Sequence, residues 1–450
     1  MPHLVIVGGS DAGVSAALRA REVAPEWEVT VIAADSLPNY SVCGLPFYLS
    51  GEVPDRWSLA HRTVEDLERS GLHLLLDHTV EGLDLRDGSV VATSPRGSER
   101  ALSYDRLVIA AGAAPVRPPI PGVDLDGVYF LHTPADAFEL HDELETAAPR
   151  SAVVVGSGYI GMEMADALTL RGLRVTLVGR APSVLPTLDP ELGQVLASEL
   201  ESHGVEVLSG VAVEAIEREG GRLHARGGDL TRSADLVLVA AGVRPRADLA
   251  AAAGLALGVR GAIWVDRHMA TKVPGVYAAG DCVETWHRLL ERPTYLPLGT
   301  TAHKQGRVAG DNAVGGERAF GGSVGTQVVK VFELVAARTG LRDQEARDAG
   351  FDPITTETTT WDHTPYYPDP HRLHVRVTGD RKTGRLLGAQ IVGPWRAEVA
   401  KRIDVFATAL YSGLSVDELS DLDLSYTPPV GRPWDAVQDA AQVWGWRPVG

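Results

Sequence analysis

The chain has 450 residues, 44% of them hydrophobic and 22% charged, and its 48 Gly and 28 Pro supply the turns of a globular protein. This length is too great for one hydrophobic core, because domains usually contain roughly 100–200 residues, so we expect two or three domains. With 42 Lys and Arg against 59 Asp and Glu, the formal net charge is −17. Such a charge argues against nucleic acid or an anionic membrane surface as the main partner.

Residues 1–8 enter a strand directly, without the basic and apolar regions of a signal peptide, and no apolar run reaches the roughly 18 residues that a membrane helix needs. We therefore expect a cytoplasmic protein without a membrane span. Two cysteines in so long a chain cannot form a disulfide framework. A reducing compartment keeps both as thiols unless one of them is used chemically.

A repeated strand, glycine turn, helix and strand organises the first part of the chain. The two copies comprise residues 4–32 and 153–178, and their turns read GGSDAG at 8–13 and GSGYIG at 156–161. Glycines permit a tight turn and a close backbone approach, while the helix N-terminus offers free N–H groups to a pyrophosphate. The first copy has Ser10 where the middle glycine is usual and is weak alone, but two copies in register indicate two dinucleotide-binding folds.

Three further segments extend this pattern. The run LVIAAGAAP at 107–115 is echoed by LVLVAAGVRP at 236–245, and each predicts a buried strand that ends in a Gly/Pro turn. The run GVYAAGDC at 275–282 predicts a strand that delivers Asp281 at a glycine turn, where its carboxylate suits the hydroxyl chain of a cofactor. A strand at 388–393 followed by an amphipathic helix at 401–409 predicts an α+β domain near the C-terminus.

Cys43 is a lone thiol between the two glycine turns, because the only other cysteine is Cys282. A helix following Cys43 would aim its N-terminus at the sulfur and lower the thiol pKa from its ordinary value of about 8.5. Any disulfide in a catalytic cycle must then involve a substrate thiol, or Cys43 must pass through a sulfenic acid. We expect Cys282 to be an inert, buried residue.

Taken together, these motifs and the CGLP run at 43–46 resemble the single-cysteine branch of the flavoprotein pyridine nucleotide-disulfide oxidoreductases. The chain looks most like coenzyme A-disulfide reductases and their persulfide-reducing relatives, with NAD(P)H oxidases close behind. Residues 298–307 and 330–334 resemble the return to the FAD domain and the start of the dimerisation domain. The resemblance implies an enzyme that uses FAD and NADPH, with NADH possible, and works as a homodimer.

The implied fold class is α/β, with two Rossmann-like domains and a C-terminal α+β dimerisation domain. The resemblance assigns 1–114 and 245–324 to the FAD-binding domain, 115–244 to the NAD(P)-binding domain and 325–450 to the dimerisation domain. In the FAD site, Asp281 would contact the ribityl chain. The other residues implied for FAD are Gly8, Ser10, Asp11, Ala12, Gly13, Asp35, Ala111, Gly112, Gly280, Thr300 and Ala302.

The nucleotide sites have two informative features. One departs from the family pattern, and the other bears on the choice between NADH and NADPH. Family members usually carry an acidic residue for the adenosine ribose at the end of the second strand; here Asp35 either replaces it with a shifted turn or caps a loop turn. An NAD-selective site would carry a carboxylate just after the strand 175–178, where it would repel a 2′-phosphate. This chain has the uncharged Gly179 there, followed by Arg180, which can pair with that phosphate. We therefore predict a preference for NADPH. The residues implied for NADPH are Gly156, Gly158, Tyr159, Ile160, Gly161, Gly179, Arg180 and Gly242.

The C-terminal third contains two tyrosine segments, 363–368 and 425–429, which resemble those that reach the active cysteine from the other subunit in coenzyme A-disulfide reductases. Tyr367 and Tyr426 are the implied proton donors, and the alternative is that they are interface residues. For coenzyme A, the implied contacts are Arg19, Arg21, Asn39 and Ser41, although both arginines equally fit an exposed basic helix face. Val42 stands where coenzyme A reducers commonly carry Asn, which weakens that assignment.

Two other functions remain open. An NAD(P)H oxidase or peroxidase would use a Cys43 sulfenic acid, but those relatives tend to carry a histidine where this chain has Asp11. A flavoprotein redox sensor or electron donor to a protein partner would not need the CGLP run or the paired tyrosine segments. We predict no metal site, because the fourteen histidines are scattered and His303 and His363 fit hydrogen-bonded loop residues.

Overall fold

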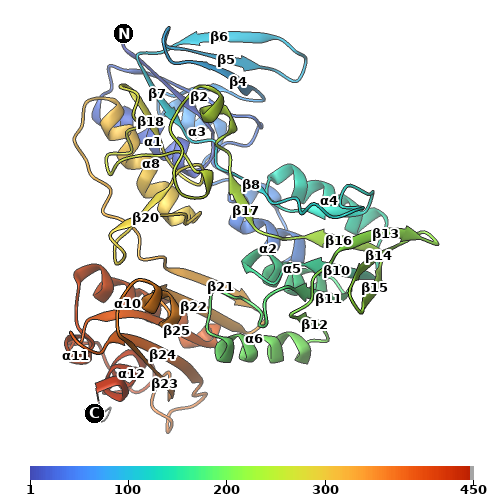
Figure 1. Ribbon diagram of the computed structural model, residues 1–450, viewed down its shortest axis with the longest axis vertical. Helices are drawn as coiled ribbons and strands as arrows, with labels where there is room; N and C mark the ends of the chain where they lie inside the picture. Colours follow the sequence, from blue (N-terminus) through green and yellow to red (C-terminus); the bar gives the residue numbers. More distant parts are fainter. Residues whose placement is uncertain (446–450) are drawn as a thin grey trace.

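The computed structural model describes residues 1–445, which form three bodies (Figure 1). The first body is built on a parallel sheet whose strands are buried on both faces by helices. Helices α1 (Asp11–Val23) and α8 (Gly299–Ala313) pack side by side on it. The strand order is β18 (Val276–Ala278), β7 (Arg106–Ile109), β1 (His3–Val7), β2 (Glu28–Ile32) and β3 (His73–Leu75).

Close contact between α1 and α8 depends on two glycines in α8. A Cβ atom at Gly306 would lie 2.2 Å from the Ala12 carbonyl oxygen, and one at Gly310 would lie 2.1 Å from the Ala16 carbonyl oxygen. Side chains at these positions would force the two helices apart. The two glycines therefore allow α8, which is distant from α1 in the sequence, to pack directly against α1.

The second body repeats this design. Its five parallel strands are β12 (Glu206–Ser209), β11 (Arg174–Gly179), β10 (Ser151–Val155), β16 (Leu236–Val239) and β9 (Val128–Phe130). Helices α4 (Pro134–Thr146), α5 (Tyr159–Leu170) and α6 (Pro190–Ser202) belong to it. The predicted internal repeat is confirmed in its strand pairing, since β1 lies between β2 and β7 as β10 lies between β11 and β16.

Short elements join and extend the two bodies. Strand β8 (Ala113–Pro115) pairs antiparallel with β17 (Val243–Pro245), so the two Gly/Pro turns of the repeat form the crossing between the bodies. Each body also carries an antiparallel three-stranded sheet, β4 (Thr79–Asp84), β5 (Ser89–Thr93) and β6 (Glu99–Ser103) in the first and β13 (Ala215–Glu219), β14 (Arg222–Gly227) and β15 (Leu230–Ala234) in the second. The remaining elements are α2 (Leu45–Ser50), α3 (Val64–Arg69), α7 (Asp248–Ala252), β19 (Thr285–His287) and β20 (Arg292–Thr294).

The third body is an α+β domain, as the sequence predicts. Its antiparallel sheet has the order β21 (Gln327–Val331), β22 (Leu334–Gly340), β25 (Leu386–Pro394), β24 (Arg372–Asp380) and β23 (Pro353–Trp361). Helices α10 (Val399–Ser412) and α12 (Ala436–Gly445) pack on the sheet, and α9 (Asp343–Asp348) and α11 (Val416–Ser420) are shorter. The predicted boundaries at 114, 244 and 324 stay predictions, and the last five residues of the range 325–450 lie outside the described residues.

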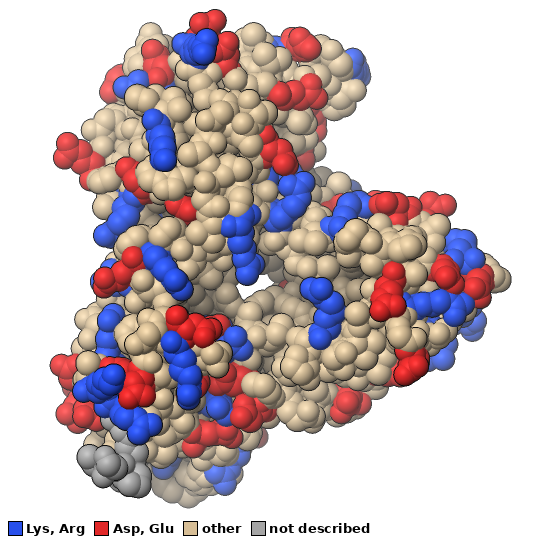
Figure 2. All heavy atoms as spheres, in the orientation of Figure 1, with Lys and Arg blue, Asp and Glu red and all other residues tan. Residues whose placement is uncertain are grey.

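Charge is mixed rather than segregated on the face shown in Figure 2, where basic side chains lie around the hollow between the three bodies in spite of the net charge of −17. In the described part of the chain, no helix is long and apolar enough to cross a membrane.

Candidate active site at a single exposed thiol

Cys43 lies in a 3-10 turn, Val42–Gly44, that leads directly into α2. The side chains of Leu45 and Leu49 are buried in the core of the second body, and α2 packs against α5. The sulfur is exposed, whereas the helix behind it is fixed. This arrangement presents a thiol at the place where the first body meets the fingerprint helix of the second.

The pKa of the Cys43 thiol is raised, which corrects the predicted direction. The protein surrounding the sulfur is the largest cause, even though one side of Cys43 is open to solvent, and the charges of Glu163, Asp11 and Asp281 add to it. The helix that was expected to lower the pKa has only six residues and begins at Leu45, two positions beyond the sulfur. Desolvation and the three carboxylates therefore decide the direction of the shift.

Glu163 is a candidate functional residue that the sequence argument missed. It lies on α5 one turn after Tyr159, so both side chains are on the same face of the fingerprint helix. Burial, followed by the charge of Asp166, raises the Glu163 pKa to about 7. In the sequence, Glu163 could have been predicted from its position four residues after Tyr159 on the same helix. A carboxyl with this pKa can hold or release a proton beside the thiol.

We expect Glu163→Gln to increase alkylation of Cys43 by iodoacetamide at pH 8 by roughly 3- to 10-fold, because one negative charge near the thiolate is removed. Since the Glu163 pKa is about 7, this carboxyl is ionised above that pH and protonated below it. The difference between variant and wild type should therefore widen as the pH rises through 7. Glu201→Gln, at the exposed end of α6, is the control. Equal rates for wild type and Glu163→Gln across this pH range would contradict the electrostatic account.

The glycines of the first fingerprint form a cradle that fits a dinucleotide. A Cβ atom at Gly8 would lie 2.1 Å from the Ala110 carbonyl oxygen, and one at Gly13 would lie 1.9 Å from the Gly8 carbonyl oxygen. Ser10 precedes α1 without capping it through its side chain, so the helix N–H groups remain available. Ala12 and Gly280 are in contact here, since a Cβ atom at Gly280 would lie 2.7 Å from the Ala12 Cβ.

Asp281 lies at the turn after β18, as predicted. Burial, with Asp11 nearby, raises its pKa to about 6, and this polar group is suited to a ligand hydroxyl. Ala111, Gly112, Thr300 and Ala302 lie in the turn after β7 and at the start of α8, and Thr300 is exposed. These residues fit FAD, and their contacts with it stay predictions.

The second fingerprint has the same geometry. A Cβ atom at Gly156 would lie 2.2 Å from the Ala240 carbonyl oxygen, and one at Gly161 would lie 1.8 Å from the Gly156 carbonyl oxygen. Tyr159 begins α5, and its hydroxyl is bonded to Thr187 Oγ1 at 3.3 Å. Burial raises the Tyr159 pKa. The other predicted positions here are Gly158 at the helix N-cap, Ile160 in the first turn and Gly242 in the turn after β16.

Gly179, the last residue of β11, and Arg180, which follows it, lie in different environments. Gly179 is buried, and a Cβ atom there would lie 2.2 Å from Ser157 Oγ, whereas Arg180 is exposed. The Arg180 guanidinium has no ion-pair partner among residues 1–445. A free cation therefore stands at the strand end where the sequence predicts recognition of a 2′-phosphate.

Several predicted contacts are used by the protein itself. Asp35 Oδ1 accepts a hydrogen bond of 3.0 Å from the Leu37 amide, which confirms the turn-capping interpretation of Asp35; its ribose contact stays a prediction. Asn39 is buried, and its Oδ1 accepts from Arg62 Nη1 at 3.2 Å. The Asn39 side chain is therefore used within the protein, and its contact with a substrate stays a prediction. Ser41 is half-buried two residues before Cys43.

The two arginines proposed for coenzyme A are also engaged. Arg19 pairs with Asp311 at 2.6 Å and with Glu22 at 2.9 Å. Arg21 Nη1 donates to the Pro25 and Trp27 carbonyl oxygens at 2.6 and 2.8 Å. Both guanidinium groups thus have partners within the protein, and their contacts with coenzyme A stay predictions.

The tyrosine segments expose their aromatic rings on the third body. Tyr366, Tyr367 and Tyr426 are 76%, 41% and 46% exposed. Desolvation and a hydrogen bond with Tyr366 raise the Tyr426 pKa. The partner of Tyr426 is therefore Tyr366, which the sequence argument did not single out, while the Tyr367 ring lies edge-on to His363 with centroids 5.9 Å apart.

Cys282 is fully buried, with its sulfur 3.4 Å from the Ala279 carbonyl oxygen, and burial raises its pKa to about 11. These observations confirm that Cys282 is buried, and the raised pKa agrees with the prediction that it is inert. His303 Nδ1 is bonded to Ser15 Oγ at 2.9 Å, and its Nε2 lies 3.5 Å from Asp11. Within the described residues, no group of three or more His, Cys, Asp or Glu side chains is arranged to hold a metal ion.

Two glycine turns that each fit a dinucleotide, together with an exposed thiol, define a redox enzyme that binds two dinucleotide cofactors. Residues 2–306 match the family model described as "Pyridine nucleotide-disulphide oxidoreductase", and residues 326–436 match the model of that family's dimerisation domain. The chain belongs to this family, whose members use FAD and NAD(P)H, and it is an FAD-dependent NAD(P)H disulfide oxidoreductase. The predicted family, fold class and enzyme class are confirmed.

Similar proteins cover nearly the whole chain. An NAD(P)H sulfur oxidoreductase (CoA-dependent) of Pyrococcus furiosus is 35% identical over 98% of each chain. The structure of an NAD-dependent persulfide reductase from A. fulgidus has a TM-score of 0.94 and 36% identity, covering 98% of this chain and 83% of that one. An engineered water-forming NADPH oxidase, made from the Lactobacillus brevis NADH oxidase, has a TM-score of 0.94 and 25% identity over 98% of each chain.

Proposed function

We propose that the protein reduces a small-molecule disulfide or persulfide, of the coenzyme A type, with electrons from NADPH. One observation carries this proposal: Cys43 is exposed, whereas Cys282, the only other cysteine, is fully buried. Cys43 has no partner for an intramolecular disulfide. A redox disulfide at Cys43 therefore takes its second sulfur from the substrate.

The sulfur chemistry balances with one protein thiol. The Cys43 thiolate attacks one sulfur of the substrate disulfide, which forms a mixed disulfide and releases one substrate thiolate. Two electrons and one proton then cleave the mixed disulfide, which restores the Cys43 thiolate and releases the second substrate thiol. FAD, when bound, supplies this electron pair after accepting a hydride from NADPH. The sum is one disulfide, one NADPH and one proton converted to two thiols and NADP⁺.

Protonation of the departing sulfur is assigned to the exposed tyrosines. A phenol beside a thiolate can donate a proton or a hydrogen bond to it. The neighbouring Tyr366 helps to raise the Tyr426 pKa, which keeps the Tyr426 phenol protonated and able to donate to the departing sulfur. The tyrosines act on Cys43 of the other subunit in a homodimer, and the exposed aromatic surface of the matched dimerisation domain supports this arrangement.

Two comparisons support the finer assignments. The name of the Pyrococcus furiosus protein includes CoA dependence, which supports coenzyme A as the thiol carrier. In the engineered NADPH oxidase, an aspartate was replaced by alanine and the next residue, an alanine, by arginine. Gly179 followed by Arg180 in this chain is the same combination of a small residue and an arginine, which supports the preference for NADPH.

The test is anaerobic turnover of the FAD-loaded protein with NADPH and coenzyme A disulfide. The proposal predicts two thiols released for each NADPH oxidised. An NAD(P)H oxidase acting through a Cys43 sulfenic acid would instead release no thiol and would consume NADPH only when O2 is admitted. Full NADPH turnover with an unreactive Cys43 would indicate an electron donor to a protein partner. Either of these two results would overturn the proposal.

A further inference from the structure

The first tyrosine segment is held by a buried carboxylate rather than by apolar packing. Residues 362–371 connect β23 to β24 and carry Tyr366 and Tyr367. A cavity of about 260 Å³ lies beside this loop, and its lining is largely polar or charged, including Asp362, His363 and Arg402. Because few apolar side chains fill the space beside it, the loop's conformation depends on hydrogen bonds.

Asp362 binds both ends of the loop. Its carboxylate accepts from the backbone amides of His363 at 2.7 Å and His371 at 2.9 Å. The two imidazoles also point to it, with Nδ1 of His363 at 2.9 Å and Nδ1 of His371 at 3.1 Å. The hydrogen bonds from the two amides lower the Asp362 pKa against the opposing effect of burial. This carboxylate therefore closes the loop at its base.

His363 extends this clamp across the loop. Its Nε2 lies 3.2 Å from the Pro368 carbonyl oxygen, so the ring spans from the Asp362 carboxylate to the far side of the loop. The two ring nitrogens of His363 therefore face oxygen atoms on both sides, the Asp362 carboxylate and the Pro368 carbonyl. A carboxylate at 362 satisfies this arrangement, whereas an amide would present an N–H group to one of the imidazoles.

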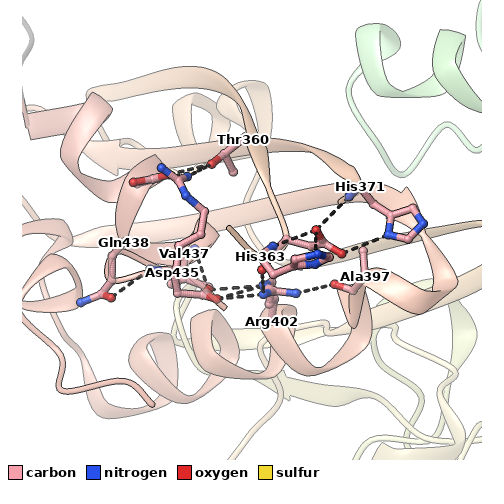
Figure 3. Close-up of polar contacts among 11 residues, drawn as sticks. Thr360, His363, His371, Ala397, Arg402, Asp435, Val437 and Gln438 are labelled. Carbon is pink, nitrogen blue, oxygen red and sulfur yellow. Dashed lines mark hydrogen bonds and ion pairs between the residues drawn. The ribbon is translucent and has the colours of Figure 1, made fainter. Parts of the chain in front are cut away.

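Hydrogen bonds also connect the loop 362–371 to the second tyrosine segment and to Asp435 beyond it. Arg402, buried on α10, donates to the Asp362 carbonyl oxygen at 2.7 Å and to Asp435 Oδ2 at 2.9 Å (Figure 3). In Figure 3, Arg402 lies between Asp435 and Ala397, and its Nη1 also donates to the Ala397 carbonyl oxygen. Thr364 Oγ1 donates directly to the Pro428 carbonyl oxygen at 2.9 Å, two residues beyond Tyr426.

We propose that Asp362 is a positioning residue that holds the Tyr366 and Tyr426 hydroxyls in register for the disulfide half-reaction. This inference rests on the proposed function, because it assigns the tyrosines to that step. Within residues 1–445, Asp362 makes no hydrogen bond or ion pair with either tyrosine, and it acts through the loop, His363 and Arg402. Its loss should therefore slow the sulfur chemistry without slowing flavin reduction.

The experiment compares Asp362→Asn with Asp380→Asn in the FAD-loaded full-length protein. Asp380 is a matched control at the other end of β24, equally buried, whose carboxylate accepts from the Asp352 amide and from the amide and hydroxyl of Thr383. Anaerobic stopped-flow kinetics follow flavin reduction by NADPH and then reoxidation by coenzyme A disulfide. We expect Asp362→Asn to leave the first rate within about 2-fold and to slow the second by roughly 10-fold or more, while Asp380→Asn changes neither.

A double variant tests the path of this effect. If Asp362 acts through the tyrosines, combining Asp362→Asn with Tyr426→Phe should add little to the effect of one substitution. The rate of flavin reoxidation in the double variant should be within about 2-fold of the rate in the slower of the two single variants. If the losses of reoxidation rate in the two single variants multiply in the double variant, the inference is overturned. So would unchanged reoxidation in Asp362→Asn, or equal slowing of both half-reactions, which is the sign of a general structural defect.

Amide hydrogen exchange keeps this inference separate from the proposed function. We expect Asp362→Asn to lose protection in both 362–371 and 424–431, whereas Asp380→Asn should lose it only around its own turn. This result does not depend on the identity of the substrate. If wild type releases no thiol from coenzyme A disulfide, the proposed function fails, and the exchange data still decide whether Asp362 holds the two segments together. Unchanged exchange in 424–431 would overturn the coupling.

Discussion

Cys43→Ser is expected to lower NADPH-dependent reduction of coenzyme A disulfide by at least about 1000-fold in kcat, because serine cannot form the mixed disulfide. Flavin reduction by NADPH should persist, since neither dinucleotide cradle includes this side chain. The sulfur is exposed and the following helix is fixed by buried Leu45 and Leu49, so the substitution should not disturb the fold. Stopped-flow measurement of the two half-reactions separates these effects.

The control for this substitution is Cys282→Ala, at the other cysteine. Cys282 is buried in the core of the first body, and its loss should reduce stability by roughly 1–2 kcal/mol while leaving disulfide reduction within about 3-fold. Retention of disulfide reduction by Cys43→Ser would show that electrons reach the substrate without the thiol. That result would contradict the proposed route.

Arg180→Ala is expected to lower the ratio of kcat/KM for NADPH to that for NADH by about 10- to 100-fold. A charge-assisted hydrogen bond contributes roughly 1.5–3 kcal/mol, and only NADPH carries the 2′-phosphate that receives it. Arg180 is exposed and has no ion-pair partner within residues 1–445, so its removal leaves no carboxylate unpaired. Steady-state kinetics with both cofactors measure the ratio.

Arg174→Ala provides the matched control, because Arg174 is an exposed arginine at the opposite end of the same strand, β11. It should leave the cofactor ratio unchanged. A ratio that stays constant in Arg180→Ala, or that falls equally in both variants, would mean that the cofactor is selected elsewhere in the domain.

The parts of the fold that were predicted correctly depend on local backbone requirements. Gly8 and Gly156 occur where any Cβ atom would meet a carbonyl oxygen of the neighbouring strand, so their pattern in the sequence reports a specific turn. The strand and helix of the third body follow from their apolar periodicity. The two antiparallel three-stranded sheets were not predicted, because their short strands are partly exposed and lack a strong apolar pattern.

The parts of the site that were missed depend on contacts between distant segments. The Cys43 pKa is raised by burial and by the charges of Glu163, Asp11 and Asp281, which come from three separate regions and converge only in the folded chain. Arg19 is paired with Asp311 on another helix, which its own sequence neighbourhood does not reveal. Tyr366 rather than Tyr367 meets Tyr426, because side-chain direction in an irregular loop follows no sequence period.

The central claim is that one protein thiol forms its redox disulfide with a substrate sulfur. The most direct measurement is intact mass spectrometry with peptide mapping of the protein after anaerobic exposure to coenzyme A disulfide, without reducing agent. The account predicts one coenzyme A on each chain, located at Cys43 and released by NADPH in the FAD-loaded protein. A free Cys43 thiol in a protein that still releases coenzyme A under NADPH would contradict it.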